Sequence, residues 1–153
     1  MSQPPQRRRR TSAARTPPGK FPTDETPGID EYQEAALLRA ALRGFLRRGE
    51  QVARTHGLTP QRYLLLLMIH GAPDGSRQAT LTDLADRLAL AQSTVTELVD
   101  RAQEAGLVVR SGSETDGRVV YVRLTDEGVR RIAPVVRALR TERDALRAVL
   151  ATP

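Results

Sequence analysis

The segment from Thr80 to Thr125 constrains the fold of this chain more than any other stretch. It reads TLTDLADRLALAQSTVTELVDRAQEAGLVVRSGSETDGRVVYVRLT. Apolar residues recur twice at helical spacing, with a break at Leu90, and then alternate with polar residues at the period of a β-strand. The pattern therefore predicts two short amphipathic helices followed by a hairpin.

Local signals indicate where these two helices begin and end. Thr80 or Thr82 can cap the first helix, and Asp83 lies where a carboxylate in the first turn favours the helix dipole. Gly106 ends the second helix, because glycine readily adopts the left-handed conformation found after many helices. The apolar face of the second helix consists of Val95, Leu98, Val99 and Ala102.

The hairpin has strands at 108–111 and 119–124, rich in β-branched residues, on either side of the polar turn SGSETDG. Two helices joined by a tight turn and followed by a hairpin form a winged helix-turn-helix, a module that typically lies in a DNA groove. We expect a mainly helical α+β fold, with residues 80–125 as the DNA-binding module.

Helical patterns also flank this module. One helix is expected over 30–56 and a second, capped by Thr59 with Pro60 in its first turn, follows directly. Thr125 can cap a long helix over 126–150, which Pro134 should bend. The terminal helices at 30–56 and 126–150 have apolar faces that the small central module cannot cover alone.

Residues 1–28 differ from the rest in composition. They hold six of the ten prolines and almost no large apolar residue, so we expect a disordered basic tail ahead of one domain at 29–153. The run Arg7–Arg10 in this tail either holds DNA phosphates or is simply solvated, and both interpretations stay open.

The charge of the chain is unevenly distributed. The net charge is +6, yet residues 80–126 contain five arginines and eight acidic residues, which gives −3. DNA-binding modules are typically basic, because neutralised phosphates dominate their affinity. The acidic balance, including Glu97, favours an alternative: a winged-helix module that binds another protein and does not bind DNA specifically.

Several classes of protein are not supported. The chain has no cysteine, and its two histidines, His56 and His70, each precede a glycine at a helix end, which favours a capping role over a metal site. No nucleophile elbow, phosphate-binding loop or HExxH pair is present, so we expect no enzyme, no cofactor and no metal. No run approaches the ~20 apolar residues of a membrane span, and we expect a cytoplasmic protein.

Four motifs resemble the MarR family of bacterial winged helix-turn-helix transcription regulators. They are LTPQRYLLLLMI at 58–69, STVTELVDRAQEAGLVVR, DGR at 116–118 and VYVRLTDEG at 120–128. The resemblance covers roughly residues 30–150. It implies a homodimer joined by the terminal helices, with double-stranded DNA as its partner at a pseudo-palindromic operator and repression as the usual outcome.

Within this resemblance the recognition helix is 92–105. Its first turns offer short polar groups that reach base edges in a major groove, namely Gln92, Ser93, Thr94, Thr96 and Glu97. Arg101, further along, is either a phosphate contact or an i,i+4 partner of Glu97.

The wing, residues 110–119, supplies the remaining candidates. Arg118 matches the family arginine that enters the minor groove, and Asp116 matches the aspartate that orients the wing. Arg110 and Ser113 are further candidate DNA contacts. An ordinary hairpin turn is the alternative for Asp116 and Gly117.

Many relatives also bind small aromatic anions between the dimer helices and the DNA module. Phe45, Arg62, Tyr63 and Met68 could line such a pocket for an unknown effector here. The preferred interpretation of these four residues is core or surface, so no ligand is assigned.

Overall fold

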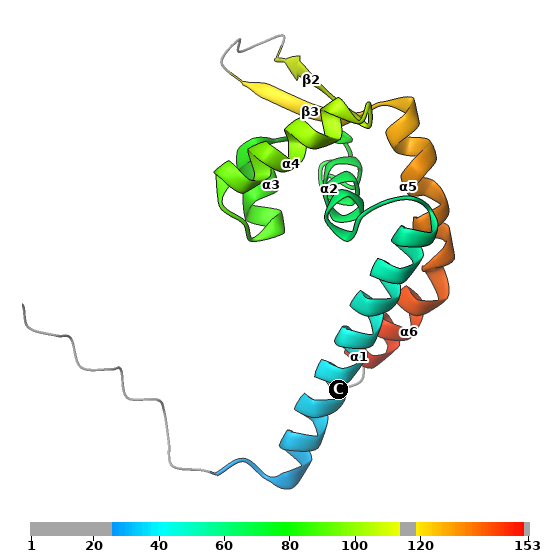
Figure 1. Ribbon diagram of the computed structural model, residues 1–153. Helices are drawn as coiled ribbons and strands as arrows, with labels where there is room; N and C mark the ends of the chain where they lie inside the picture. The colour runs from blue at the N-terminus through cyan, green and yellow to red at the C-terminus, as the bar shows by residue number, and fades with distance from the viewer. Residues whose placement is uncertain (1–25, 114–118, 152–153) are drawn as a thin grey trace, which may run out of the picture.

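The computed structural model describes residues 26–113 and 119–151. Within these ranges the chain forms six helices and three short strands (Figure 1). In chain order they are α1 (Ile29–Thr55), α2 (Pro60–His70), β1 (Gln78–Thr80), α3 (Leu81–Leu88), α4 (Gln92–Glu104), β2 (Val108–Gly112), β3 (Val120–Leu124), α5 (Asp126–Ala138) and α6 (Arg140–Leu150). The mainly helical fold with a small antiparallel sheet confirms the expected fold class.

Three threonines begin helices where the sequence predicts them. The Thr59 hydroxyl accepts a hydrogen bond from the Arg62 backbone N–H at 3.2 Å. Thr125 accepts one from the Gly128 N–H at 3.1 Å. Thr80 is the cap of α3: its hydroxyl accepts from the Asp83 N–H at 3.1 Å, and its own N–H donates to the Asp83 carboxylate at 2.9 Å, which completes a capping box.

The sheet has the order β1-β3-β2 and is antiparallel throughout. Val122 in the central strand lies opposite Ala79 of β1 and Arg110 of β2. The sequence predicts strands at 108–111 and 119–124 alone, so β1 is an addition to the predicted hairpin. Its three residues carry no strand pattern of their own, and only their pairing with β3 makes them a strand.

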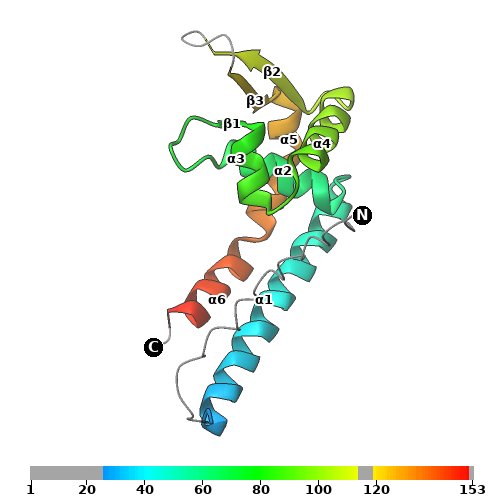
Figure 2. The ribbon, with the colours of Figure 1, turned by 90° about the vertical axis from the view of Figure 1, so that its left-hand side faces the viewer.

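Helix α2 lies at the centre of the hydrophobic core. Its Leu65, Leu66 and Ile69 are fully buried, and the helix lies behind α3 and α4 in Figure 2. Leu84 of α3, Val95 and Val99 of α4 and Val122 of β3 complete the centre of this core. The core therefore belongs to the helix-turn-helix module and the helices beside it.

The C-terminal helical segment differs from its prediction. One helix bent at Pro134 was expected. The structure has two helices: α5 continues through Pro134 and ends at Ala138, and α6 begins at Arg140, so the helical segment is interrupted at Leu139. Leu139 is fully buried, and Arg143 Nη1 donates a 2.7 Å hydrogen bond to the Val136 carbonyl near the break. Burial of Leu139 and this bond favour the break five residues after the proline.

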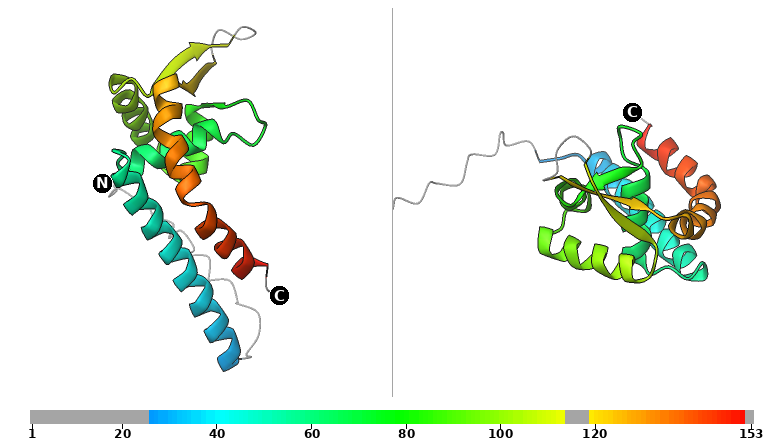
Figure 3. Two further views of the ribbon diagram at one scale, coloured as in Figure 1. Left: turned by 90° about the vertical axis from the view of Figure 1, so that its right-hand side faces the viewer. Right: turned by 90° about the horizontal axis from the view of Figure 1, so that it is seen from above.

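The terminal helices extend away from the module, with α6 alongside α1 (Figures 1 and 3). Only Gly49, Val52 and Ala53 of α1 are buried, and α6 has no buried residue. The large exposed apolar residues of these two helices are Ile29, Tyr32, Leu37, Leu38, Leu42, Leu46 and Leu150. In the part of the chain that the structure describes, no helix is long and apolar enough to cross a membrane.

Candidate nucleic-acid interface

Helix α4 has one face in the core and the opposite face in solvent. Val95, Leu98, Val99 and Ala102 are buried. Gln92, Ser93 and Glu97 are exposed, whereas Thr94 and Thr96 are half-buried. The helix thus presents its first two turns to solvent, at the positions that the sequence predicts for base contacts.

Hydrogen bonds within α4 occupy some of these side chains. The Thr96 hydroxyl donates to the Gln92 carbonyl at 2.9 Å. Arg101 donates from Nε to the Glu97 carbonyl at 3.2 Å and pairs with the Glu97 carboxylate at 3.5 Å. The i,i+4 pairing that was one of the two interpretations of Arg101 is therefore present.

A left-handed residue forms the turn between α3 and α4. Ala89 has φ 51° and ψ 45°, and the Leu90 N–H donates to the Ala85 carbonyl at 3.1 Å. This bond pattern is that of a Schellman motif, in which glycine is usual at the left-handed position. The turn directs α4 away from α3, so that the start of α4 is exposed.

The wing is the β2–β3 hairpin, which extends from the module near α4 (Figure 1). Arg110 of β2 pairs with Asp100 at 2.6 Å and donates to Gln103 Oε1 at 2.9 Å. The Ser113 N–H donates to the Val119 carbonyl at 2.9 Å and extends the hairpin. Asp116 and Arg118 lie outside the described residues, so their predicted roles stay predictions.

The arginines of the segment from α3 to β2 all have partners within the chain. Arg87 donates to the Met68 carbonyl at 3.0 Å, and Arg101 and Arg110 form the ion pairs described above. Asp86, Glu97, Asp100 and Glu104 are exposed on the same two helices. Helices α3 and α4 therefore carry more acidic than basic side chains, as the charge distribution along the sequence predicts.

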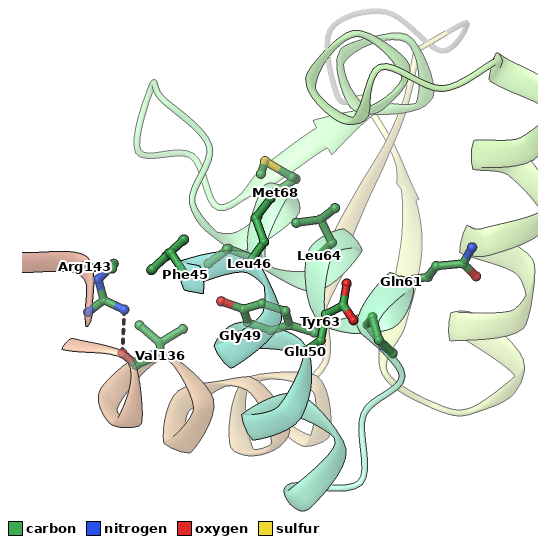
Figure 4. Close-up of a pocket in the computed structure, with 12 residues that line it drawn as sticks. Phe45, Leu46, Gly49, Glu50, Gln61, Tyr63, Leu64, Met68, Val136 and Arg143 are labelled. Carbon is green, nitrogen blue, oxygen red and sulfur yellow. Dashed lines mark hydrogen bonds between the residues drawn. The ribbon is translucent and has the colours of Figure 1, made fainter. Parts of the chain in front are cut away.

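A second feature is an apolar pocket of about 610 Å³ beside the module (Figure 4). Phe45, Tyr63 and Met68 line it, which corrects the preferred interpretation of these residues as core or surface only, whereas Arg62 does not line it. Arg143 of α6 lines it instead, and no sequence signal indicated that residue. Burial raises the pKa of the Tyr63 hydroxyl, and the positive charge of Arg143 partly opposes this rise.

The pocket joins elements that are far apart in the sequence. Its walls come from α1, α2 and the α5–α6 segment. Glu50 at its edge is paired with Arg54 at 3.4 Å, and Arg143 donates to the Val136 carbonyl. Over residues 26–113 and 119–151, no group of three or more histidine or acidic side chains is arranged to hold a metal ion.

Comparison with known proteins agrees with this geometry. The sequence profile of the MarR family matches residues 56–119. The chain is 30% identical to the HTH-type transcriptional regulator MhqR of Bacillus subtilis over 74 residues, which are 48% of each protein. It is also 30% identical to a putative transcriptional regulatory protein for the hcr operon of Thauera aromatica, over 71% of this chain and 63% of that protein.

These curated relatives are matched over about half to just under two thirds of their own length. The structural likeness extends further. A MarR family protein from Bacillus stearothermophilus superposes with a TM-score of 0.66 and 27% sequence identity, over 84% of both chains. The sequence profile and this solved structure both belong to the MarR family, and the chain is similar to the winged helix-turn-helix proteins of that family.

Proposed function

We propose that this chain is a sequence-specific DNA-binding regulator of transcription. In this proposal α4 reads base edges in the major groove, and the wing follows the DNA phosphate backbone into the minor groove. The observation that carries the proposal is the exposed start of α4, which presents Gln92, Ser93 and Glu97 on a helix fixed by its buried face. A rigid helix with short polar groups at its N-terminal end is the usual reader of base edges.

Particular contacts follow from this placement. Gln92 pairs with adenine, Thr94 or Thr96 contacts a thymine methyl group, and Glu97 accepts a bond from a cytosine amine. Arg118 enters the minor groove and Asp116 orients it, with Ser113 and Arg101 beside the phosphates. A mutant of Escherichia coli MarR has been solved with operator DNA; it is 19% identical to this chain, with a TM-score of 0.58.

We also propose that the regulator is a homodimer joined through α1 and α6. Both helices leave leucines exposed, and the two halves of α1 carry opposite charge: Asp30, Glu31 and Glu34 come first, then Arg39, Arg43 and Arg47. A second α1 in antiparallel orientation would place acidic residues against arginines. Two recognition helices related by a two-fold axis then reach half-sites about 10 bp apart.

Repression is the outcome we favour, since a dimer over a promoter blocks polymerase. The transcriptional repressor MdtR of B. subtilis is 31% identical over 74 residues.

The apolar pocket beside α2 supports a small, mainly apolar effector. We assign no specific ligand to it.

Selection from a random duplex library, with sequencing of the bound fraction, tests the DNA proposal directly. We expect an enriched pseudo-palindrome, and its half-site spacing reports whether a dimer binds. Titration of a fluorescent duplex of the selected sequence at several salt concentrations then gives affinity and salt slope. No enrichment, together with no salt-dependent binding by the full chain, would overturn the proposal and favour the protein-binding alternative, which the acidic surface of α4 supports.

Two variants refine this experiment. Arg118→Ala should weaken binding at moderate salt, and unchanged affinity would remove Arg118 from the interface. Deletion of residues 1–28 asks whether Arg7–Arg10 supplies phosphate contacts, in which case the salt slope falls with the tail.

A further inference from the structure

The recognition helix and the wing are joined by a fork of polar contacts centred on Arg110. One terminal nitrogen of its guanidinium donates to Asp100 Oδ1 at 2.6 Å, and the other donates to Gln103 Oε1 at 2.9 Å. Asp100 and Gln103 lie one helical turn apart on α4, and Arg110 lies on β2. The planar guanidinium therefore bridges two turns of the helix from a single point on the strand.

This contact is distinct from the other ion pairs of the described chain. Five of the pairs within residues 26–113 and 119–151 join residues three or four apart on one helix, and another joins α1 to α6. The pair between Arg110 and Asp100 is the one among them that joins α4 to β2. It is also the shortest of these pairs, and the Arg110 side chain is 28% exposed.

The position of Arg110 along the wing gives the fork its effect. The base of β2 is held by the buried Leu107 and Val108. Beyond Arg110, Gly112 and the facing Val120 are exposed, and Val120 keeps 42% of its surface in solvent. A two-stranded ribbon without a buried face is only marginally ordered on its own. The fork lies between the packed base and the exposed outer part.

We propose that Arg110, Asp100 and Gln103 form a strut that fixes the angle between the recognition helix and the wing, and that Arg110 is a positioning residue and not a phosphate contact. The guanidinium is neutralised by Asp100 and both its terminal nitrogens are engaged. The role in DNA binding rests on the function proposed above.

Hydrogen–deuterium exchange of the free full-length protein tests the strut without DNA. Asp100→Asn and Arg110→Gln should each raise the rate of amide exchange in β2 and β3 by a similar factor. That factor is about three- to ten-fold, as expected for the loss of a partly exposed charged hydrogen bond. The double variant should exchange little faster than either single variant. The swap of the two charges, Asp100→Arg together with Arg110→Asp, should restore protection of the amides from exchange. Arg123→Gln, an exposed arginine of β3, is the matched control and should leave exchange unchanged.

The salt dependence of DNA binding separates a strut from a phosphate contact. If Arg110 is a strut, Asp100→Asn and Arg110→Gln lower affinity for the selected site by similar factors and leave the slope of log K against log[salt] unchanged. If Arg110 contacts a phosphate, Arg110→Gln lowers the slope by about one, and Asp100→Asn leaves affinity unchanged or increases it.

Either of two results overturns the proposal: unchanged exchange in both single variants, or the phosphate-contact pattern in the salt titration. Absence of DNA binding by the unmodified protein contradicts the proposed function alone, since the exchange experiment still decides whether the strut holds the wing. Both substitutions are on the surface and remove no buried apolar group, and a thermal melt confirms that each variant is folded.

Discussion

Gly128 in the first turn of α5 lies directly against the carbonyl oxygen of Leu107, at the start of the wing. A Cβ atom at position 128 would approach that oxygen more closely than the 3.0 Å that real Cβ atoms keep. Thr125 reinforces the contact, because its N–H donates to the Leu107 carbonyl at 3.0 Å and its hydroxyl donates to the Gly106 carbonyl at 2.7 Å. The backbone N–H and the hydroxyl of Thr125 thus hold the start of α5 against the backbone that follows the recognition helix.

Gly128→Ala should destabilise the protein by at least about 2 kcal/mol, because the obstacle is backbone and cannot rotate away. Chemical denaturation followed by circular dichroism measures this loss. Gly44→Ala in α1 is the matched control, since nothing lies within 4 Å of its added methyl group. It should stabilise the helix by about 0.5–1 kcal/mol. A Gly128→Ala variant as stable as the parent would show that the junction relaxes freely.

Ala89→Gly should stabilise the protein by about 0.5–1 kcal/mol. Ala89 occupies the left-handed region with φ 51°, where a Cβ atom is unfavourable and glycine is not strained. Ala105→Gly at the end of α4 is the control, because Ala105 has φ −78° and gains nothing from the exchange. Thermal melts of the two variants should shift in opposite directions, or only the Ala89 variant should rise. Equal shifts in the melting temperatures of the two variants would exclude strain at Ala89 as the cause.

Leu42→Glu in α1 should dissociate the proposed dimer. Leu42 is 44% exposed in the single chain, and a carboxylate at an apolar interface is costly without a partner. We expect the dimer dissociation constant to rise at least about 100-fold, measured by sedimentation equilibrium. Thr82→Glu on α3 adds the same charge far from α1 and should leave the association unchanged. Identical sedimentation of the two variants would place the interface elsewhere.

Asp83→Asn should alter how stability depends on pH. The Thr80 backbone N–H and hydroxyl donate to the Asp83 carboxylate and hold its pKa below the ordinary value of 3.8. The stabilisation is therefore complete above pH about 4 and is lost as the pH falls through the folded-state pKa. For this partly exposed group we expect about 0.5 kcal/mol between parent and variant at neutral pH.

Denaturation midpoints at neutral pH and in acid measure the effect of Asp83→Asn. The difference between parent and variant should shrink below pH 4. Asp86→Asn on the exposed face of the same helix is the control and should show little difference at either pH. A constant difference across the range would mean that the cap does not depend on the carboxylate charge.

Gln92→Ala should lower affinity for the selected operator by about 1–3 kcal/mol, because a bidentate contact to adenine is lost. Affinity for a mixed-sequence duplex should change little, since Gln92 carries no charge. Gln103→Ala is not a suitable control, as Gln103 belongs to the strut. Gln51→Ala, exposed on α1, serves instead. Equal losses on both duplexes would mean that Gln92 does not read a base.

Much of the fold could be predicted from the sequence, because its signals are local. Thr59, Thr80 and Thr125 cap helices through bonds to residues three positions later, and Gly106 has the left-handed φ of 71° that ends α4. Strand β1 was missed because Gln78–Thr80 becomes a strand only by pairing with β3. The interruption at Leu139 was missed, because burial of Leu139 depends on tertiary packing.

Only those parts of the candidate site that depend on local sequence signals could be predicted. The exposed start of α4 follows from the helical period of its apolar face. The partners of Arg110 could not be found by helical spacing, because the contact joins a helix to a strand ten residues away. Arg143 reaches the pocket only because the chain turns after Leu139, whereas Arg62, although close to Tyr63 in the sequence, does not line it.

The absence of any buried residue in α6 has a thermodynamic consequence. An eleven-residue helix with all its side chains at least partly in water is marginal by itself, so α6 gains order mainly from what it packs against. If that includes a second copy, amide exchange in α6 slows as protein concentration rises, whereas exchange in α2 does not change. The order of the C-terminal helix would then depend on the concentration of the protein.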